Sequence, residues 1–180
     1  MTTERQQRIG FLLRKNAGEK KRPIYQEKLS RILSKGQHDV AFLSLEESEK
    51  VAEAFFAEVR ANEEGKVQSR TKLSRAGWDS LEQDLLKIRD FATDRQLYVL
   101  LPDADCVGAF PLAEKDFLLH GVRLYQEFNE NVCAVDPKEC KYGIMIDYFE
   151  DFYHGIENFD AIFYGNARAL MLPLEQKNPS

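Results

Sequence analysis

The chain has 180 residues, of which 43% are hydrophobic, 11% aromatic and 31% charged, and its net charge is −5. This length and apolar content suit one folded domain and exclude a disordered chain. No apolar run approaches the ~18 residues of a membrane-spanning helix. The polar start, Met1 to Arg8, lacks a signal-peptide core, and the acidic balance argues against nucleic acid as a partner.

The first 36 residues carry helix signals and much of the basic charge. A capping box of Thr3 and Gln6 predicts a first helix, and Gly18 provides its end signal. Pro23 suits the first turn of a second helix, which Gly36 ends. Each helix has apolar residues at helical spacing: Ile9, Leu12 and Leu13 in the first, and Tyr25, Leu29, Ile32 and Leu33 in the second.

The next segment, residues 40–92, continues with helical patterns. Residues 40–43 are apolar and predict a short extended stretch, after which Ser44 and Glu47 form a second capping box. Residues 62–76 are polar and predict a loop. Two helices are expected here, one on each side of this loop. The first has an apolar face of Val51, Ala54, Phe55 and Val59, and the second, which starts at Trp78, has one of Leu81, Leu85, Ile88 and Ala92.

From residue 97 onward the pattern favours strands. Residues 97–101 form an apolar run of strand length, residues 102–105 have turn chemistry, and residues 106–110 suit the partner strand of a hairpin. The remaining predicted elements are a helix at 113–128 and strands at 131–135, 142–147 and 160–164.

This order predicts an α+β fold, in which N-terminal helices precede a small mixed or antiparallel sheet packed with helices. We expect residues 1–180 to form a single domain. Within it, residues 1–36 are the basic helical N-terminal segment, residues 37–172 the α+β core, and residues 173–180 a flexible tail.

No known catalytic or cofactor motif appears along the chain. Its glycines match neither dinucleotide nor P-loop spacing, and it lacks a nucleophile elbow and a zinc-protease helix. Cys106, Cys133 and Cys140 have no CxxC spacing, so we predict no metal site and no cofactor. An odd cysteine count without a secretory signal indicates a reducing compartment, and we expect a cytoplasmic protein.

The net charge is unevenly distributed: residues 1–40 carry +6, residues 41–100 carry −3 and residues 101–180 carry −8. The strongest local feature is the window 147–160, with five acidic and five aromatic residues. No lysine or arginine occurs between Lys141 and Arg168.

Two interpretations of this window remain open. In the first, Phe149, Phe152, Phe159 and Phe163 belong to the core, and the acids form the solvated side of the same element. In the second, the window is an exposed acidic surface with aromatic anchors that steers a basic partner. The contact set predicted by the second interpretation is Asp147, Tyr148, Glu150, Asp151, Tyr153, Glu157 and Asp160.

The chain resembles the small acidic immunity proteins of bacterial contact-dependent inhibition and other polymorphic-toxin systems. The likeness covers mainly residues 95–165 and lies in the size, the absence of catalytic motifs and the stretch K-Y-G-I-M-I-D-Y-F-E-D-F. These families share no invariant functional motif, so the resemblance assigns no residue a role. It implies a cytoplasmic protein that binds one cognate toxin domain and occludes its active site.

The leading functional prediction is therefore a non-enzymatic immunity protein that neutralises a basic toxin domain, for example a nuclease. Neither nucleic acid nor a membrane is expected as a partner. One alternative is a regulatory or adaptor protein that binds an acidic partner through its basic N-terminal helices. Another is a small enzyme whose site follows no known motif.

Overall fold

The structure is a computed structural model and describes residues 2–36, 39–63, 70–138, 141–151 and 154–172. It confirms the α+β prediction, because N-terminal helices precede a six-stranded antiparallel sheet. The helices are α1 (Thr2–Leu33), α2 (Leu45–Glu63), α3 (Trp78–Arg89), α4 (Ala104–Val107) and α5 (Glu114–Phe128), and the 3-10 helix η2 is Gly165–Met171. The strands are β1 (Arg70–Arg75), β2 (Gln96–Leu100), β3 (Phe110–Ala113), β4 (Val132–Val135), β5 (Gly143–Asp151) and β6 (Ile156–Tyr164).

The strands lie in the order β1-β6-β5-β4-β2-β3, and each neighbouring pair is antiparallel. The longest pairing joins β5 to β6, from Gly143 opposite Tyr164 to Asp151 opposite Ile156. The predicted choice between a mixed and an antiparallel sheet is thereby decided for the antiparallel one. None of the helices within the described residues is both long and apolar enough to cross a bilayer.

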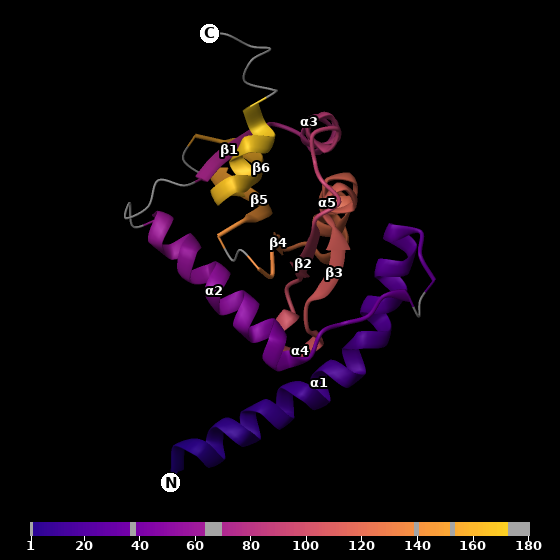
Figure 1. Ribbon diagram of the computed structural model, residues 1–180, viewed down its shortest axis with the longest axis vertical. Coiled ribbons are helices and arrows are strands. Elements are labelled where there is room, and N and C mark those ends of the chain that lie inside the picture. The colour runs from indigo at the N-terminus through magenta and orange to yellow at the C-terminus, as the bar shows by residue number, and fades with distance from the viewer. Residues whose placement is uncertain (1, 37–38, 64–69, 139–140, 152–153, 173–180) are drawn as a thin grey trace.

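Helices cover both faces of the sheet (Figure 1). Side chains alternate along each strand, so neighbouring residues of β5 enter different cores. Ile144 and Ile146 join the larger core with residues of α1, α3 and α5. Met145 joins the smaller core, in which Phe55 of α2 is fully buried.

The two helices predicted before residue 36 are one helix, because α1 continues through Gly18 and Pro23. Gly18 is not an end signal: a Cβ atom there would collide with the backbone carbonyl of Cys106 in α4. Pro23 lacks an N–H and cannot donate to the carbonyl one turn earlier. The Arg22 side chain ties this part of α1 to the body by donating to the carbonyls of Val107, at 2.8 Å, and Leu43, at 3.2 Å.

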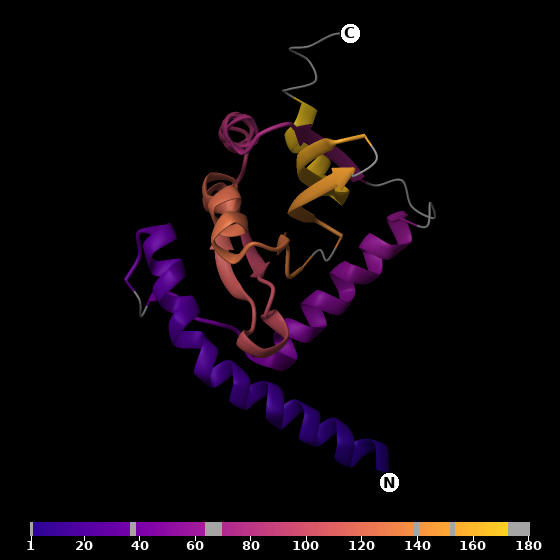
Figure 2. The same ribbon diagram turned by 180° about the vertical axis from the view of Figure 1, so that it is seen from behind.

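The N-terminal end of α1 extends beyond the rest of the molecule (Figure 2). The apolar stripe there is exposed, with relative accessibilities of 48% for Ile9, 48% for Leu12 and 64% for Leu13. Farther along the helix Gly18 is buried against α4, and Tyr25, Leu29 and Leu33 enter the larger core. Helical spacing of apolar residues therefore marks a stripe along α1 but does not say which part of it is covered.

Other predicted boundaries differ as well: β5 continues four residues past the strand predicted at 142–147, and β6 begins four residues before the one predicted at 160–164. The expected loop at 62–76 contains strand β1, a polar edge strand with Leu73 buried. The expected strand at 106–110 begins inside helix α4. The strand that pairs with β2 in the hairpin is instead β3. Residues 40–43 adopt no strand, although the Leu43 N–H donates to the Ala109 carbonyl at 2.8 Å.

Elements with strong periodicity or end signals match their predictions. The capping box at the start of α2 is formed, because the Ser44 N–H donates to Glu47 Oε2 and the Glu47 N–H donates to Ser44 Oγ, each at 3.2 Å. Helix α5 and strands β2 and β4 lie within one residue of the predicted ranges. Helix α3 begins at Trp78 as predicted but ends at Arg89, three residues before Ala92. The predicted tail at 173–180 lies outside the described residues.

Candidate functional site

The acidic and aromatic window forms the outer end of the β5–β6 hairpin. Strand β4 pairs with β5 only as far as Ile146, and β1 pairs with β6 only as far as Phe159. Residues 147–151 pair with residues 156–160, of which Phe159 and Asp160 also pair with β1. Among the described residues, 149–151 and 156–158 therefore pair only with each other. We call residues 147–151 and 156–160 the acidic ribbon, because its outer part, 149–151 with 156–158, projects past the neighbouring strands as a two-stranded extension.

The register places acids opposite acids at two positions of the acidic ribbon. Asp147 lies opposite Asp160, and Glu150 lies opposite Glu157. Directly opposed like charges destabilise an antiparallel pair. A two-stranded ribbon is also marginal without further packing. The acidic ribbon therefore depends on contacts to the body of the protein.

Those contacts come from a series of aromatic rings on the face that carries α3 and α5. The ring centroids of Tyr148 and Phe159 lie 5.3 Å apart, Phe159 and Trp78 lie 4.0 Å apart, and Trp78 and Tyr125 lie 4.7 Å apart. Such contacts contribute beyond simple area burial. They connect the base of the acidic ribbon to helices α3 and α5 and hold Tyr148 in place.

Glu150 and Glu157 share this face with Tyr148, because side chains two residues apart in a strand point the same way. Glu157 is exposed and Glu150 is half-buried. Desolvation and the charges of both glutamates raise the pKa of Tyr148, so its hydroxyl stays protonated as a hydrogen-bond donor. This face therefore presents two carboxylates around a neutral tyrosine hydroxyl.

The opposite face of the acidic ribbon is organised around an ion pair between the exposed Lys72 and the buried Asp160. Lys72 Nζ lies 2.7 Å from Asp160 Oδ2 and 5.7 Å from the centroid of the Phe149 ring. Asp160 is only 3% exposed, and its Oδ1 has no hydrogen-bond partner among the described residues. Burial, followed by the charge of Asp160, raises the pKa of Asp147.

Strand alternation thus divides the predicted contact set between two faces. Tyr148, Glu150 and Glu157 lie together, whereas Asp147 and Asp160 lie on the other side of the sheet. The prediction of Asp160 as an exposed contact is wrong, since its carboxylate is buried against Lys72. Tyr153 and the side chain of Asp151 lie outside the described residues.

Some aromatic residues of the window are core residues and others are exposed. Phe163 is fully buried and Phe159 packs against the larger core, as the core interpretation predicts. Phe149 is 52% exposed, and Ile156, which was not among the predicted contacts, is 48% exposed. Their common face follows from the register of β5 and β6, which the sequence does not reveal. Phe152 is outside the described residues.

Replacing Asp147 with asparagine is expected to stabilise the protein at pH 7 by a few tenths of a kcal/mol up to about 1 kcal/mol, because it removes a half-buried charge that also lies opposite Asp160. The pKa of Asp147 is raised in the folded state. Its ionised form therefore costs stability above the ordinary aspartate range, and the cost disappears when both states are protonated. Urea unfolding at pH 7 and near pH 3.5 measures the effect. If the free energy of unfolding rises equally at both pH values, the ionised carboxylate of Asp147 is not the source of the effect.

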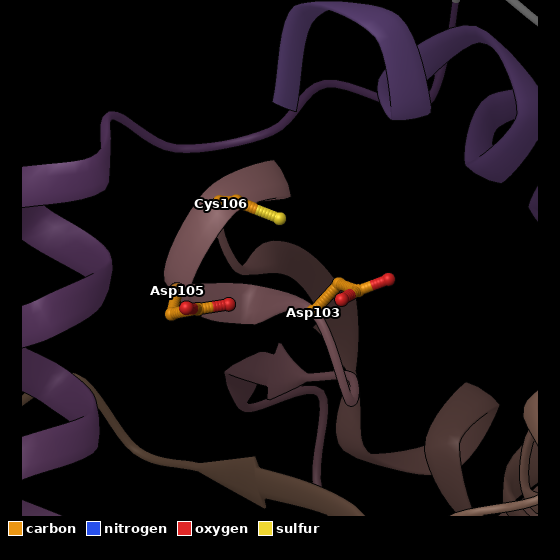
Figure 3. A group of neighbouring side chains, drawn as sticks. All are labelled: Asp103, Asp105 and Cys106. Carbon is orange, nitrogen blue, oxygen red and sulfur yellow. The ribbon is translucent and has the colours of Figure 1, made fainter. Parts of the chain in front are cut away.

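A second group of acids lies around α4, where Asp103, Asp105 and Cys106 bring one ligand-type atom each within 4.8 Å of one another (Figure 3). Asp103 already binds two residues of α1: Lys21 Nζ at 2.8 Å and the Tyr25 hydroxyl at 2.6 Å. Burial raises the pKa of Cys106, which keeps its thiol protonated. These contacts attach α1 to α4 and give the group a structural role.

The two described cysteines, Cys106 and Cys133, are buried free thiols. Cys140 lies outside the described residues.

Comparisons of the chain with family models, curated proteins and solved structures found no match. The geometry and charge of the acidic ribbon are therefore the observations that bear on its role.

Proposed function

We propose that this chain is a cytoplasmic, non-enzymatic immunity protein that binds a basic toxin domain through the acidic ribbon and occludes its active site. The observation that carries the proposal is the opposed pair Glu150 and Glu157 on a ribbon that projects from the sheet. Keeping two like charges face to face costs folding stability. A basic partner that neutralises them recovers this cost on binding.

The contact face that fits this role is formed by Tyr148, Glu150 and Glu157. Tyrosine combines apolar area with a hydroxyl and is enriched in interfaces, and carboxylates attract the cationic groups of a phosphate-binding active site. A nuclease is one toxin class with such a site, because its substrate is a polyanion. Phe149 and Ile156 lie on the opposite face, so a partner that contacts them as well would have to bind both faces of the acidic ribbon.

The test begins with purification of the tagged chain from its native cells and identification of the bound protein. Binding of that protein is then measured by calorimetry at low and high salt. Changing both Glu150 and Glu157 to lysine exchanges one like-charged pair for another, so the ribbon keeps its local repulsion while its sign reverses. We expect at least tenfold weaker binding at low salt, with a smaller difference at high salt.

The matched control changes Glu27 and Asp90 to lysine, since both are exposed and lie on α1 and at the end of α3. This control has the same net charge as the ribbon variant and is expected to bind as the parent chain does. A bound protein with no toxic activity in the absence of this chain contradicts the immunity role. Equal binding by the two variants contradicts the ribbon as its contact surface.

The adaptor alternative has one observation in its favour, which is the exposed stripe of Ile9, Leu12 and Leu13 on the projecting end of α1. Arg5 and Arg8 on the same end are exposed as well. A surface that combines apolar and cationic groups suits an acidic partner with an apolar patch. Changing Leu12 and Leu13 to glutamine abolishes binding under this alternative and leaves it unchanged under the immunity proposal.

A further inference from the structure

A cavity of about 450 Å³ lies between α2, α4 and the central strands. Figure 1 shows the start of α2 beside α4, where the helix crosses the end of the sheet. Five residues of α2 line it: Ser48, Glu49, Ala52, Glu53 and Phe56. The short side chains of Ser48 and Ala52 leave space above the strands. The volume falls in the range of small-molecule sites.

The floor of the cavity is apolar and chemically unreactive. It is formed by Leu100, Cys133 and Met145, all of which belong to the smaller core. Burial raises the pKa of Cys133 to about 12, so the thiol stays protonated and serves as an apolar surface. A ligand in this cavity therefore places an apolar body against the floor.

The rim of the cavity is acidic. Glu49, Glu53, Asp105 and Glu130 line it, and Arg14 is the only cationic side chain among the described lining residues. Arg14 Nη1 lies 2.6 Å from Glu49 Oε1, so the charges of these two side chains largely neutralise each other. Three carboxylates remain around an opening with apolar walls, which concentrates a negative potential there.

We infer that this cavity binds a small organic cation, such as a protonated amine attached to an aromatic ring or a short alkyl chain. The apolar body covers Leu100, Cys133 and Met145, and the cationic group meets the carboxylates of the rim. No residue of the acidic ribbon whose side chain the structure describes lines the cavity. The inference is therefore independent of the proposed immunity function.

The probe for this site is 2-phenylethylamine, compared with 2-phenylethanol, which has the same shape without the charge. We expect saturable changes in the amide NMR signals of residues around Ala52 and Cys133, with a dissociation constant on the order of 1 mM or below. The alcohol is expected to bind at least tenfold more weakly at low salt. Equal binding of amine and alcohol overturns the inference, as does the absence of saturable changes with the amine.

Two variants test the location of the site. Changing Glu53 and Glu130 to glutamine removes rim charge and is expected to weaken amine binding at least fivefold, whereas changing Glu27 to glutamine and Asp90 to asparagine leaves it unaltered. Changing Ala52 to phenylalanine fills the cavity and is expected to abolish binding, with thermal unfolding as the check of its fold. Binding that survives in both the rim and the filled variants overturns the inference.

Discussion

Replacing Gly18 with alanine is expected to lower the free energy of unfolding by about 2–3 kcal/mol, the cost of forcing an extra group into a tight contact. A Cβ atom at Gly18 would meet the carbonyl oxygen of Cys106, which belongs to the backbone of α4 and cannot rotate away. Helix α1 would have to move off α4 and strain the pairing of Lys21 and Tyr25 with Asp103.

The matched control is Gly10 to alanine in the same helix, because a Cβ atom there has nothing within 4 Å. Alanine is a better helix former than glycine by about 1 kcal/mol, so this variant is expected to be neutral or slightly more stable. Urea unfolding followed by the fluorescence of Trp78 measures both. If the Gly10 variant loses as much free energy of unfolding as the Gly18 variant, close packing against α4 is not the cause.

Replacing Glu114 with alanine is expected to cost about 3 kcal/mol or more, because it leaves buried donors without their acceptor. Glu114 is fully buried at the start of α5. Its Oε2 accepts from the Thr93 N–H at 2.8 Å, and its Oε1 accepts from the Tyr142 hydroxyl. Tyr142 is itself buried beneath Arg95, whose guanidinium carbon lies 3.9 Å from the ring centroid.

Glutamine at position 114 is expected to cost distinctly less than alanine. Its carbonyl oxygen can still accept from Thr93, and its amide can donate to the Tyr142 hydroxyl, which then acts as the acceptor. Asp116 to alanine is the control in the same first turn of α5 and is expected to cost a few tenths of a kcal/mol. Equal losses for the alanine and glutamine variants at position 114 contradict the hydrogen-bond explanation.

The acidic ribbon illustrates how far residue types alone define a site. The sequence shows that acids and aromatic residues gather between 147 and 160. Only the pairing of β5 with β6 shows that Glu150 faces Glu157. The same pairing, together with Lys72 from the distant strand β1, explains why Asp160 is buried. Membership of a contact surface thus depends on register and on a partner about 90 residues away.

The cavity beside α2 is beyond any sequence pattern. Its floor comes from β2, β4 and β5, and its rim from α1, α2, α4 and the residues before β4. Ser48 and Ala52 are common residues in a helix. The cavity forms only because the fold holds α2 above strands β2, β4 and β5 at these two short side chains. Glu49 and Glu130 likewise carry no sign in the sequence that they share one opening.

Local signals in the sequence determined the α+β class, the start of α2 at its Ser44–Glu47 capping box, and the positions of α3, α5, β2 and β4. These features rest on hydrogen bonds and periodicity within a few residues. The tertiary structure decided the continuity of α1, the strand at 70–75 and the faces of the acidic ribbon. At Gly18 the reason is plain: glycine ends a helix when its own backbone turns, but it continues one when another backbone approaches, and only the fold brings α4 there.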